Sequence, residues 1–179
     1  RISVDGDMST NDTVMVLAAG LVPLRASEQR AFERAVAEVM RDLALAIVED
    51  GEGATKHLVV RVEGARNRGE AEILARAVGG SALVKTAMYG QDPNWGRILA
   101  AIGSTRVPVD PEKTEIVVGT CRLFHKGVPT GELPVRRARR EMKDRVLPIL
   151  VKVGSGDGQF TLHTTDLSHE YVTINAPYE

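Results

Sequence analysis

The chain has 179 residues, of which 43% are hydrophobic, so it is long enough to fold around one sizeable core. Its 23 basic and 24 acidic side chains nearly cancel, which leaves no overall field to attract nucleic acid or an anionic membrane. The single cysteine, Cys121, excludes an internal disulfide framework, and no apolar run approaches the roughly 18 residues of a membrane span. We therefore expect a cytoplasmic protein that binds neither nucleic acid nor membranes.

The first third of the chain contains three predicted elements. Residues 14–19 are a short apolar run, which favours a strand buried on both faces over a surface helix, although a helix remains open. From Ser27, a suitable N-cap, apolar residues recur at spacings of three and four and indicate a long amphipathic helix. Residues 57–63 alternate between apolar and polar side chains, which is typical of a strand with one buried face. The helical stripe consists of Phe32, Val36, Val39, Leu43 and Ile47.

Two shorter helices are predicted in the middle of the chain. Residues 68–78 repeat the helical spacing and are followed by two glycines that end the helix. Residues 95–102 form the second helix, with Asn94 as its N-cap. Between them, residues 83–89 fit a strand as well as a helix.

The second half is predicted to be richer in strands. A turn at Lys126-Gly127 follows the first pair of strands, and a basic helix is predicted over 135–146. The last two strands flank a loop with three glycines and are predicted to form a hairpin. The four strands are predicted at 115–118, 121–124, 149–153 and 160–164.

These elements predict a layered α/β fold with mixed sheets, because close strand pairs after residue 114 require antiparallel neighbours. The loop 105–113 is the best candidate boundary, and it divides the chain into a larger part, 1–108, and a smaller C-terminal part, 109–179. The start Ile2-Ser3-Val4 has the character of a strand with nothing before it to pair with. We therefore expect a further segment upstream.

Glu52 is the candidate binding residue that the spacing itself suggests. It lies between Gly51 and Gly53 at the predicted turn from helix to strand, where the missing side chains would let a ligand approach the carboxylate. The glycine spacing does not match a phosphate-binding loop. A solvated turn and a binding carboxylate both remain open from the pattern alone.

Other candidate sites are weaker. The run of arginines over 136–140 has no interleaved aromatic residue to stack on bases, and Glu141 and Asp144 follow it on the same helix, so we interpret it as a solvated face. The four histidines lack metal-ligand spacing, and no serine–histidine–aspartate pattern is present. We expect no metal site.

Several longer stretches together resemble one family. They are the sequence ISVDGDMSTNDT at 2–13, the hexapeptide 51–56, the sequence LVKTAMYGQDPNWGRI at 83–98, and the ending YVTINAPY at 171–178. In this order they resemble the β chain of the ornithine acetyltransferase, or ArgJ, family. The resemblance covers nearly the whole chain.

The resemblance implies a precursor that cleaves itself before a threonine, and the resulting α and β chains stay together. That threonine, upstream of Arg1, would be the nucleophile and would carry the acetyl group as an ester. N-acetylornithine would donate the acetyl group and leave as ornithine, and glutamate would accept it to become N-acetylglutamate, in arginine biosynthesis. No metal or diffusible cofactor is implied, although acetyl-CoA serves as a donor in bifunctional members.

For this segment the resemblance implies two substrate-binding residues, Glu52 and Asn175, and no catalytic residue. It also implies an αββα sandwich whose mixed sheets are shared with the separate α chain, plus a smaller C-terminal lobe. The expected assembly is α2β2 or larger. A self-processed aminopeptidase or amidase, and a non-catalytic amino-acid-binding subunit, remain as alternative functions.

Overall fold

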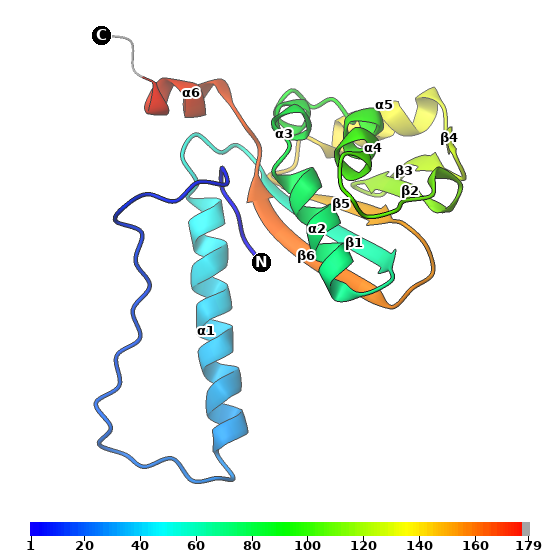
Figure 1. Cartoon of the computed structure of the whole chain (residues 1–179). Coiled ribbons are helices and arrows are strands. Elements are labelled where there is room, and N and C mark those ends of the chain that lie inside the picture. The colour runs from blue at the N-terminus through cyan, green and yellow to red at the C-terminus, as the bar shows by residue number, and fades with distance from the viewer. Residues whose placement is uncertain (177–179) are drawn as a thin grey trace.

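The computed structural model describes residues 1–176 and shows a mixed α/β fold (Figure 1). Helices and strands interleave along the chain, as the sequence pattern predicts. In chain order the elements are α1 (Gln29–Glu49), β1 (His57–Ala65), α2 (Arg68–Gly79), α3 (Ala82–Tyr89), α4 (Trp95–Gly103), a 3₁₀ turn (Pro111–Lys113), β2 (Glu115–Val118), β3 (Cys121–His125), β4 (Val128–Pro129), α5 (Glu132–Glu141), β5 (Val146–Lys152), β6 (Gly158–Thr165) and α6 (His169–Asn175).

The strands form one six-stranded sheet in the order β4-β3-β2-β5-β1-β6. β1 runs parallel to β5 and antiparallel to β6, so the sheet is mixed. Ile2 adds a parallel bridge to His163 on the outer side of β6. The sheet takes strands from both sides of residue 108, and the division into 1–108 and 109–179 stays a prediction.

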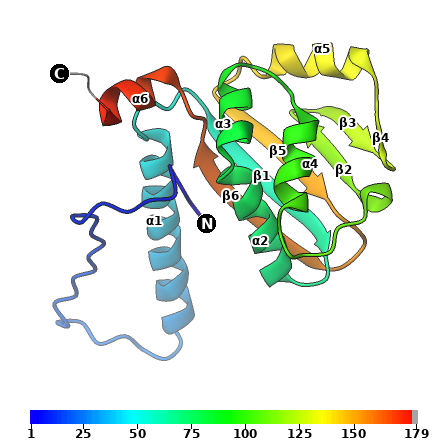
Figure 2. The ribbon, with the colours of Figure 1, turned by 45° about the horizontal axis from the view of Figure 1, so that its top comes forward.

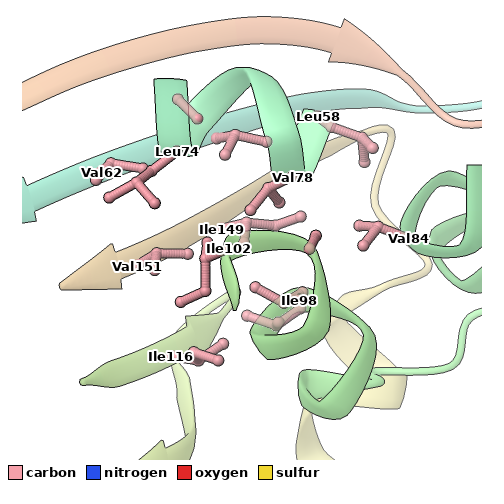
Figure 3. Close-up of a cluster of buried hydrophobic side chains, with 14 of the residues drawn as sticks. Leu58, Val62, Leu74, Val78, Val84, Ile98, Ile102, Ile116, Ile149 and Val151 are labelled. Carbon is pink, nitrogen blue, oxygen red and sulfur yellow. The ribbon is translucent and has the colours of Figure 1, made fainter. Parts of the chain in front are cut away.

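Helices α2, α3 and α4 lie over one face of the sheet, and α1 stands apart beside the edge strand β6 (Figure 2). The core forms where α2 and α4 meet this face (Figure 3). In β1 the alternate residues Leu58, Val60 and Val62 are buried, which confirms the predicted strand and its apolar face. Residues 1–176 form one sheet, and the second sheet of an αββα sandwich, shared with an α chain, stays a prediction.

Local patterns account for the helices that cover the sheet. Asn67 caps α2, and the predicted inward residues of this helix are all buried. Asn94 accepts a hydrogen bond from the Arg97 amide at 3.1 Å, as predicted for the cap of α4. Residues 83–89, which fit two structures, are helical in α3, where Ser81 provides the cap.

The predicted hairpin between the last two strands is wrong, because β1 lies between β5 and β6. The connecting loop crosses the end of β1 at very close range. The Gly156 amide donates to the Gly64 carbonyl at 3.1 Å, and a Cβ on Gly64 would lie 2.2 Å from the Gly154 carbonyl oxygen. The glycines that suggested a tight turn therefore allow the chain to pass over another strand.

The predicted strand over 14–19 is also wrong. Val14, Val16 and Leu17 are 73%, 70% and 91% exposed in an extended segment without regular structure. An isolated strand leaves its backbone groups unpaired, and within residues 1–176 no strand pairs with this run. Its apolar side chains are exposed and have no partner surface within residues 1–176.

Helix ends differ in detail from the prediction. The long helix begins at Gln29 with Glu28 in the cap position, so Ser27 is not the cap. The basic helix α5 ends at Glu141, and Val146 already belongs to β5. Lys126 and Gly127 have φ angles of 50° and 78°, which confirms the predicted turn before β4.

Candidate functional site

The candidate site lies where α1 turns into β1, beneath the C-terminal helix α6 (Figure 1). Glu52 lies in this turn and is exposed. Asn175 is the last residue of α6, and its Nδ2 donates to Glu52 Oε2 at 2.9 Å and to the Tyr171 carbonyl at 3.0 Å. The fold thus brings together two predicted site residues that are 123 positions apart in the chain.

The glycines beside Glu52 make room for the protein's own chain. Gly53 has a φ of +61°, and a Cβ there would lie 2.4 Å from the Tyr171 nitrogen. On the other side, a Cβ on Gly51 would lie 2.9 Å from Thr165 Cγ2. Ligand access is the role that the sequence suggests for these glycines, whereas in the structure they let α6 and β6 pack against the turn.

A buried carboxylate holds the turn from below. Asp166 follows β6 and is 3% exposed. It accepts hydrogen bonds from the Thr55 amide at 2.9 Å and the Lys56 amide at 3.0 Å, and also from the Thr55 hydroxyl. Ser168 donates to the Gly53 carbonyl at 2.5 Å and accepts from the Tyr171 amide as the cap of α6. The end of β6 therefore fixes both the turn and the helix that covers it.

The N-terminal segment closes the site on its third side. Asp5 accepts hydrogen bonds from the Asp7 amide at 2.9 Å and the Tyr171 hydroxyl at 3.0 Å. Desolvation works against ionisation of Asp5, but these two hydrogen bonds bring its pKa below the usual value. Burial, the bond to Asp5 and the nearby negative charges raise the pKa of Tyr171, so it remains a hydrogen-bond donor near neutral pH.

Sequence reasoning did not identify Asp166, Lys85 or Tyr171 as parts of this region. Lys85 is 4% exposed, and its ammonium donates to the Val4 carbonyl and, at 3.3 Å, to the Thr165 hydroxyl. Burial lowers the pKa of Lys85, against the opposing charges of Asp5 and Asp166. One signal was available: Lys85 is the only charged residue in the run 82–89.

The described residues hold no group of three histidine, cysteine, aspartate or glutamate side chains that could bind a metal ion. The reaction's independence of metals and cofactors stays a prediction. No helix within residues 1–176 combines the length and apolar character needed to cross a bilayer. Residues 177 and 178 of the ending used for the resemblance lie outside the described part of the chain.

Comparison with known proteins decides the family. The family model described as "ArgJ family" matches residues 1–179. The chain belongs to the ArgJ family. This confirms the resemblance on which Glu52 and Asn175 were chosen, while the roles of these two residues stay predictions.

Two names occur among the curated proteins that are similar to this ArgJ-family chain. The chain is 46% identical over 177 residues to the "Arginine biosynthesis bifunctional protein ArgJ" of Parasynechococcus marenigrum, and the match covers 99% of this chain and 43% of that protein. It is 43% identical over 183 residues to the "Glutamate N-acetyltransferase" of Methanopyrus kandleri, covering 99% of this chain and 47% of that protein. The chain thus spans less than half the length of these curated relatives.

A solved structure confirms the fold. The crystal structure of the bifunctional arginine-biosynthesis protein ArgJ from Bacillus halodurans matches with a TM-score of 0.90 and 41% identity. The match covers 99% of this chain and 86% of the crystallised chain. That chain is therefore of similar length to this one, in contrast to the longer curated relatives.

Proposed function

We propose that this chain is the C-terminal half of an enzyme that moves an acetyl group from N-acetylornithine to glutamate in arginine biosynthesis. The upstream half supplies a threonine that carries the acetyl group as an ester, and ornithine and N-acetylglutamate are the products. Acetyl-CoA is a second acetyl donor if the enzyme is bifunctional. The observation that carries the proposal is the contact between Glu52 and Asn175 in a chain of the ArgJ family.

The geometry supports a site for an amino acid. Glu52 offers an exposed carboxylate for a charged amino group, and the amide of Asn175 holds that carboxylate in one direction. Because the turn is fixed by Asp166 and Ser168, little conformational freedom is lost when a substrate binds. The site is incomplete in this chain, since none of its residues is placed as a nucleophile.

The upstream half is proposed as the permanent partner. The chain covers 43% to 47% of its curated relatives but 86% of the crystallised homologue, which supports a precursor divided into two chains. The apolar stripe of α1 is exposed here, with Phe32 at 55%, Leu43 at 58% and Ile47 at 53%. Such a stripe is a protein–protein interface in the assembled molecule. We further propose a cytoplasmic assembly of α2β2 or larger.

The test uses the full protein and N-acetylornithine labelled in its acetyl group. With glutamate present, the label is expected in N-acetylglutamate, and a labelled threonine is expected after denaturation without glutamate. Release of free acetate at the same rate with and without glutamate would instead identify a self-processed aminopeptidase or amidase. Binding of the amino acid without any transfer would identify a non-catalytic subunit.

Glu52→Gln tests the site itself. The substitution keeps the shape and removes the charge, which weakens a charge-assisted contact by about 1.5–3 kcal/mol, or roughly 10- to 150-fold in binding. Precursor cleavage is expected to continue, because it involves the backbone at the upstream junction. Glu112→Gln, at an exposed position in the 3₁₀ turn, is the matched control. Unchanged transfer by Glu52→Gln would remove this residue from the site.

A further inference from the structure

Lys85 is a buried cation to which the function proposed above assigns no role. It lies in α3 and is 4% exposed. Placing a charge in a protein interior is unfavourable unless polar groups surround it. Its ammonium donates to the Val4 carbonyl and to the Thr165 hydroxyl, and the Thr165 hydroxyl donates to the same carbonyl at 3.1 Å. These contacts fasten residue 4 to the inner end of β6.

One path leads from this junction directly to the turn. Gly51 packs between the side chains of Thr165 and Val4, which would lie 2.9 Å and 3.2 Å from a Cβ at that position. Lys85 thus bonds to both residues, Val4 through its carbonyl and Thr165 through its hydroxyl, whose side chains form the surface on which Gly51 rests. Glu52 is the next residue, so a shift of this surface moves its backbone.

A second path reaches the same carboxylate through α6. Asp5, directly after Val4, accepts the hydrogen bond from the Tyr171 hydroxyl at 3.0 Å. Tyr171 lies one helical turn before Asn175 and accepts a hydrogen bond from it, while Asn175 also donates to Glu52. The segment 4–5 thus supports the Glu52–Asn175 pair from both of its flanks.

We propose that Lys85 is a positioning residue for acetyl transfer: by holding the Val4 carbonyl, its ammonium keeps residues 4–5 where they orient the Glu52–Asn175 pair toward substrate. The proposal rests on the function proposed above. Lys85 itself is too far inside to meet a substrate, and its burial, which lowers its pKa, is consistent with a role within the protein.

Lys85→Met in the full protein is the first test, because it keeps the length of the side chain and removes the ammonium. Since a displacement of 1 Å can cost on the order of 100-fold, we expect kcat/KM to fall by about 10- to 100-fold, mainly through a higher KM for both amino-acid substrates. Ile116→Val, in the core on β2, is the control for loss of stability alone: its Tm should fall while KM is unchanged. A wild-type KM for Lys85→Met would overturn the proposal.

Combining Lys85→Met with Glu52→Gln separates positioning from general destabilisation. If Lys85 acts through Glu52, the double variant is no slower than the slower single variant, within a factor of about 2. Multiplied losses would show an independent role and overturn the proposal. If Lys85→Met does not fold, Thr165→Val is the substitute, because it removes the hydroxyl that bonds to both the Lys85 ammonium and the Val4 carbonyl. It is expected to raise KM in the same way, and an unchanged KM would overturn the proposal.

Hydrogen exchange gives a readout that does not depend on activity. In Lys85→Met the amides of 51–55 and of α6 should exchange faster than in the wild type, whereas Ile116→Val should leave them unchanged. Unaltered exchange in this region would overturn the positioning role even if acetyl transfer is confirmed. If the wild-type protein transfers no acetyl group but Lys85→Met still shows the faster exchange, the proposed function is rejected and the positioning role of Lys85 is not.

Discussion

Removal of the Asp166 carboxylate should loosen the turn that carries Glu52. The carboxylate accepts three hydrogen bonds, from two amides and one hydroxyl of residues 55 and 56. In Asp166→Asn the Oδ1 atom can still accept both amides, and the Thr55 hydroxyl can turn to accept from the new NH2 group that replaces Oδ2. The two amide bonds are no longer charge-assisted, which costs about 1 kcal/mol each. Asp166→Ala leaves both amides without a partner, at about 1–3 kcal/mol each, and the lower end applies to exposed Thr55. We therefore expect a loss of about 2 kcal/mol for Asn and about 2–4 kcal/mol for Ala.

Urea unfolding of the full protein measures these losses. The midpoint should decrease from wild type to Asp166→Asn to Asp166→Ala at an unchanged slope. Asp157→Asn, in the exposed loop after β5, is the matched control and should stay within about 0.5 kcal/mol of wild type. Equal midpoints for Asp166→Ala and Asp157→Asn would refute the view that Asp166 fixes the turn.

Three further predictions concern pH, backbone fit and assembly. Burial lowers the pKa of His57, and burial and the neighbouring His57 lower the pKa of His163. Because the unfolded chain then binds more protons than the folded chain just below about pH 6.5, the free energy of unfolding should fall as the pH drops from about 7.5 to 5.5. Urea titrations at several pH values measure this slope, and His163→Asn should flatten it. Gly53→Ala should lower Tm more than Gly20→Ala, because both positions have positive φ but only the first would place a Cβ against α6; equal shifts in Tm would contradict that contact. Leu43→Glu on the exposed stripe of α1 should reduce co-purification with the upstream half, and full recovery of the complex would show that this half does not cover α1.

Local signals in the sequence predicted most of the elements that cover the sheet. Asn94 could be predicted as the cap of α4 because a capping side chain bonds to an amide within three residues of its own position, and the stripe of α2 depends only on helical spacing. The strands β1, β2, β3, β5 and β6 were also located, because apolar runs and the alternation along β1 are local properties, whereas β4 was not predicted. Partners of the strands were not predictable in the same way, since pairing depends on residues far along the chain.

The wrong strand over 14–19 and the wrong hairpin have one physical origin. A strand over 14–19 needs a partner that residues 1–176 do not supply, so its apolar character alone does not produce a strand. The expected hairpin failed because β1, more than 80 residues earlier, inserts between β5 and β6. Short connections usually join neighbouring strands, and here the close approach of glycines permits the exception.

The candidate site was predicted in part. Glu52 was found from its flanking glycines and the resemblance, and Asn175 from the resemblance alone. Their contact, and the support from Asp166 and Lys85, could not be read from the sequence. These residues meet their partners only after the chain has folded back, over 123 positions for Asn175, 110 for Asp166 and 80 to 81 for Lys85. An acidic residue at a strand end and a lysine in an apolar run are also common without any role in a site.

The position of β1 between β5 and β6 determines when this protein can fold. Its two neighbours in the sheet begin at residues 146 and 158, so neither exists when β1 leaves the ribosome. Contacts so distant along the chain raise the contact order, which slows folding and prolongs exposure of unpaired strand edges. Because the turn at Glu52 is held by Asp166, the carboxylate of Glu52 reaches its final place only after almost the whole chain has been synthesised.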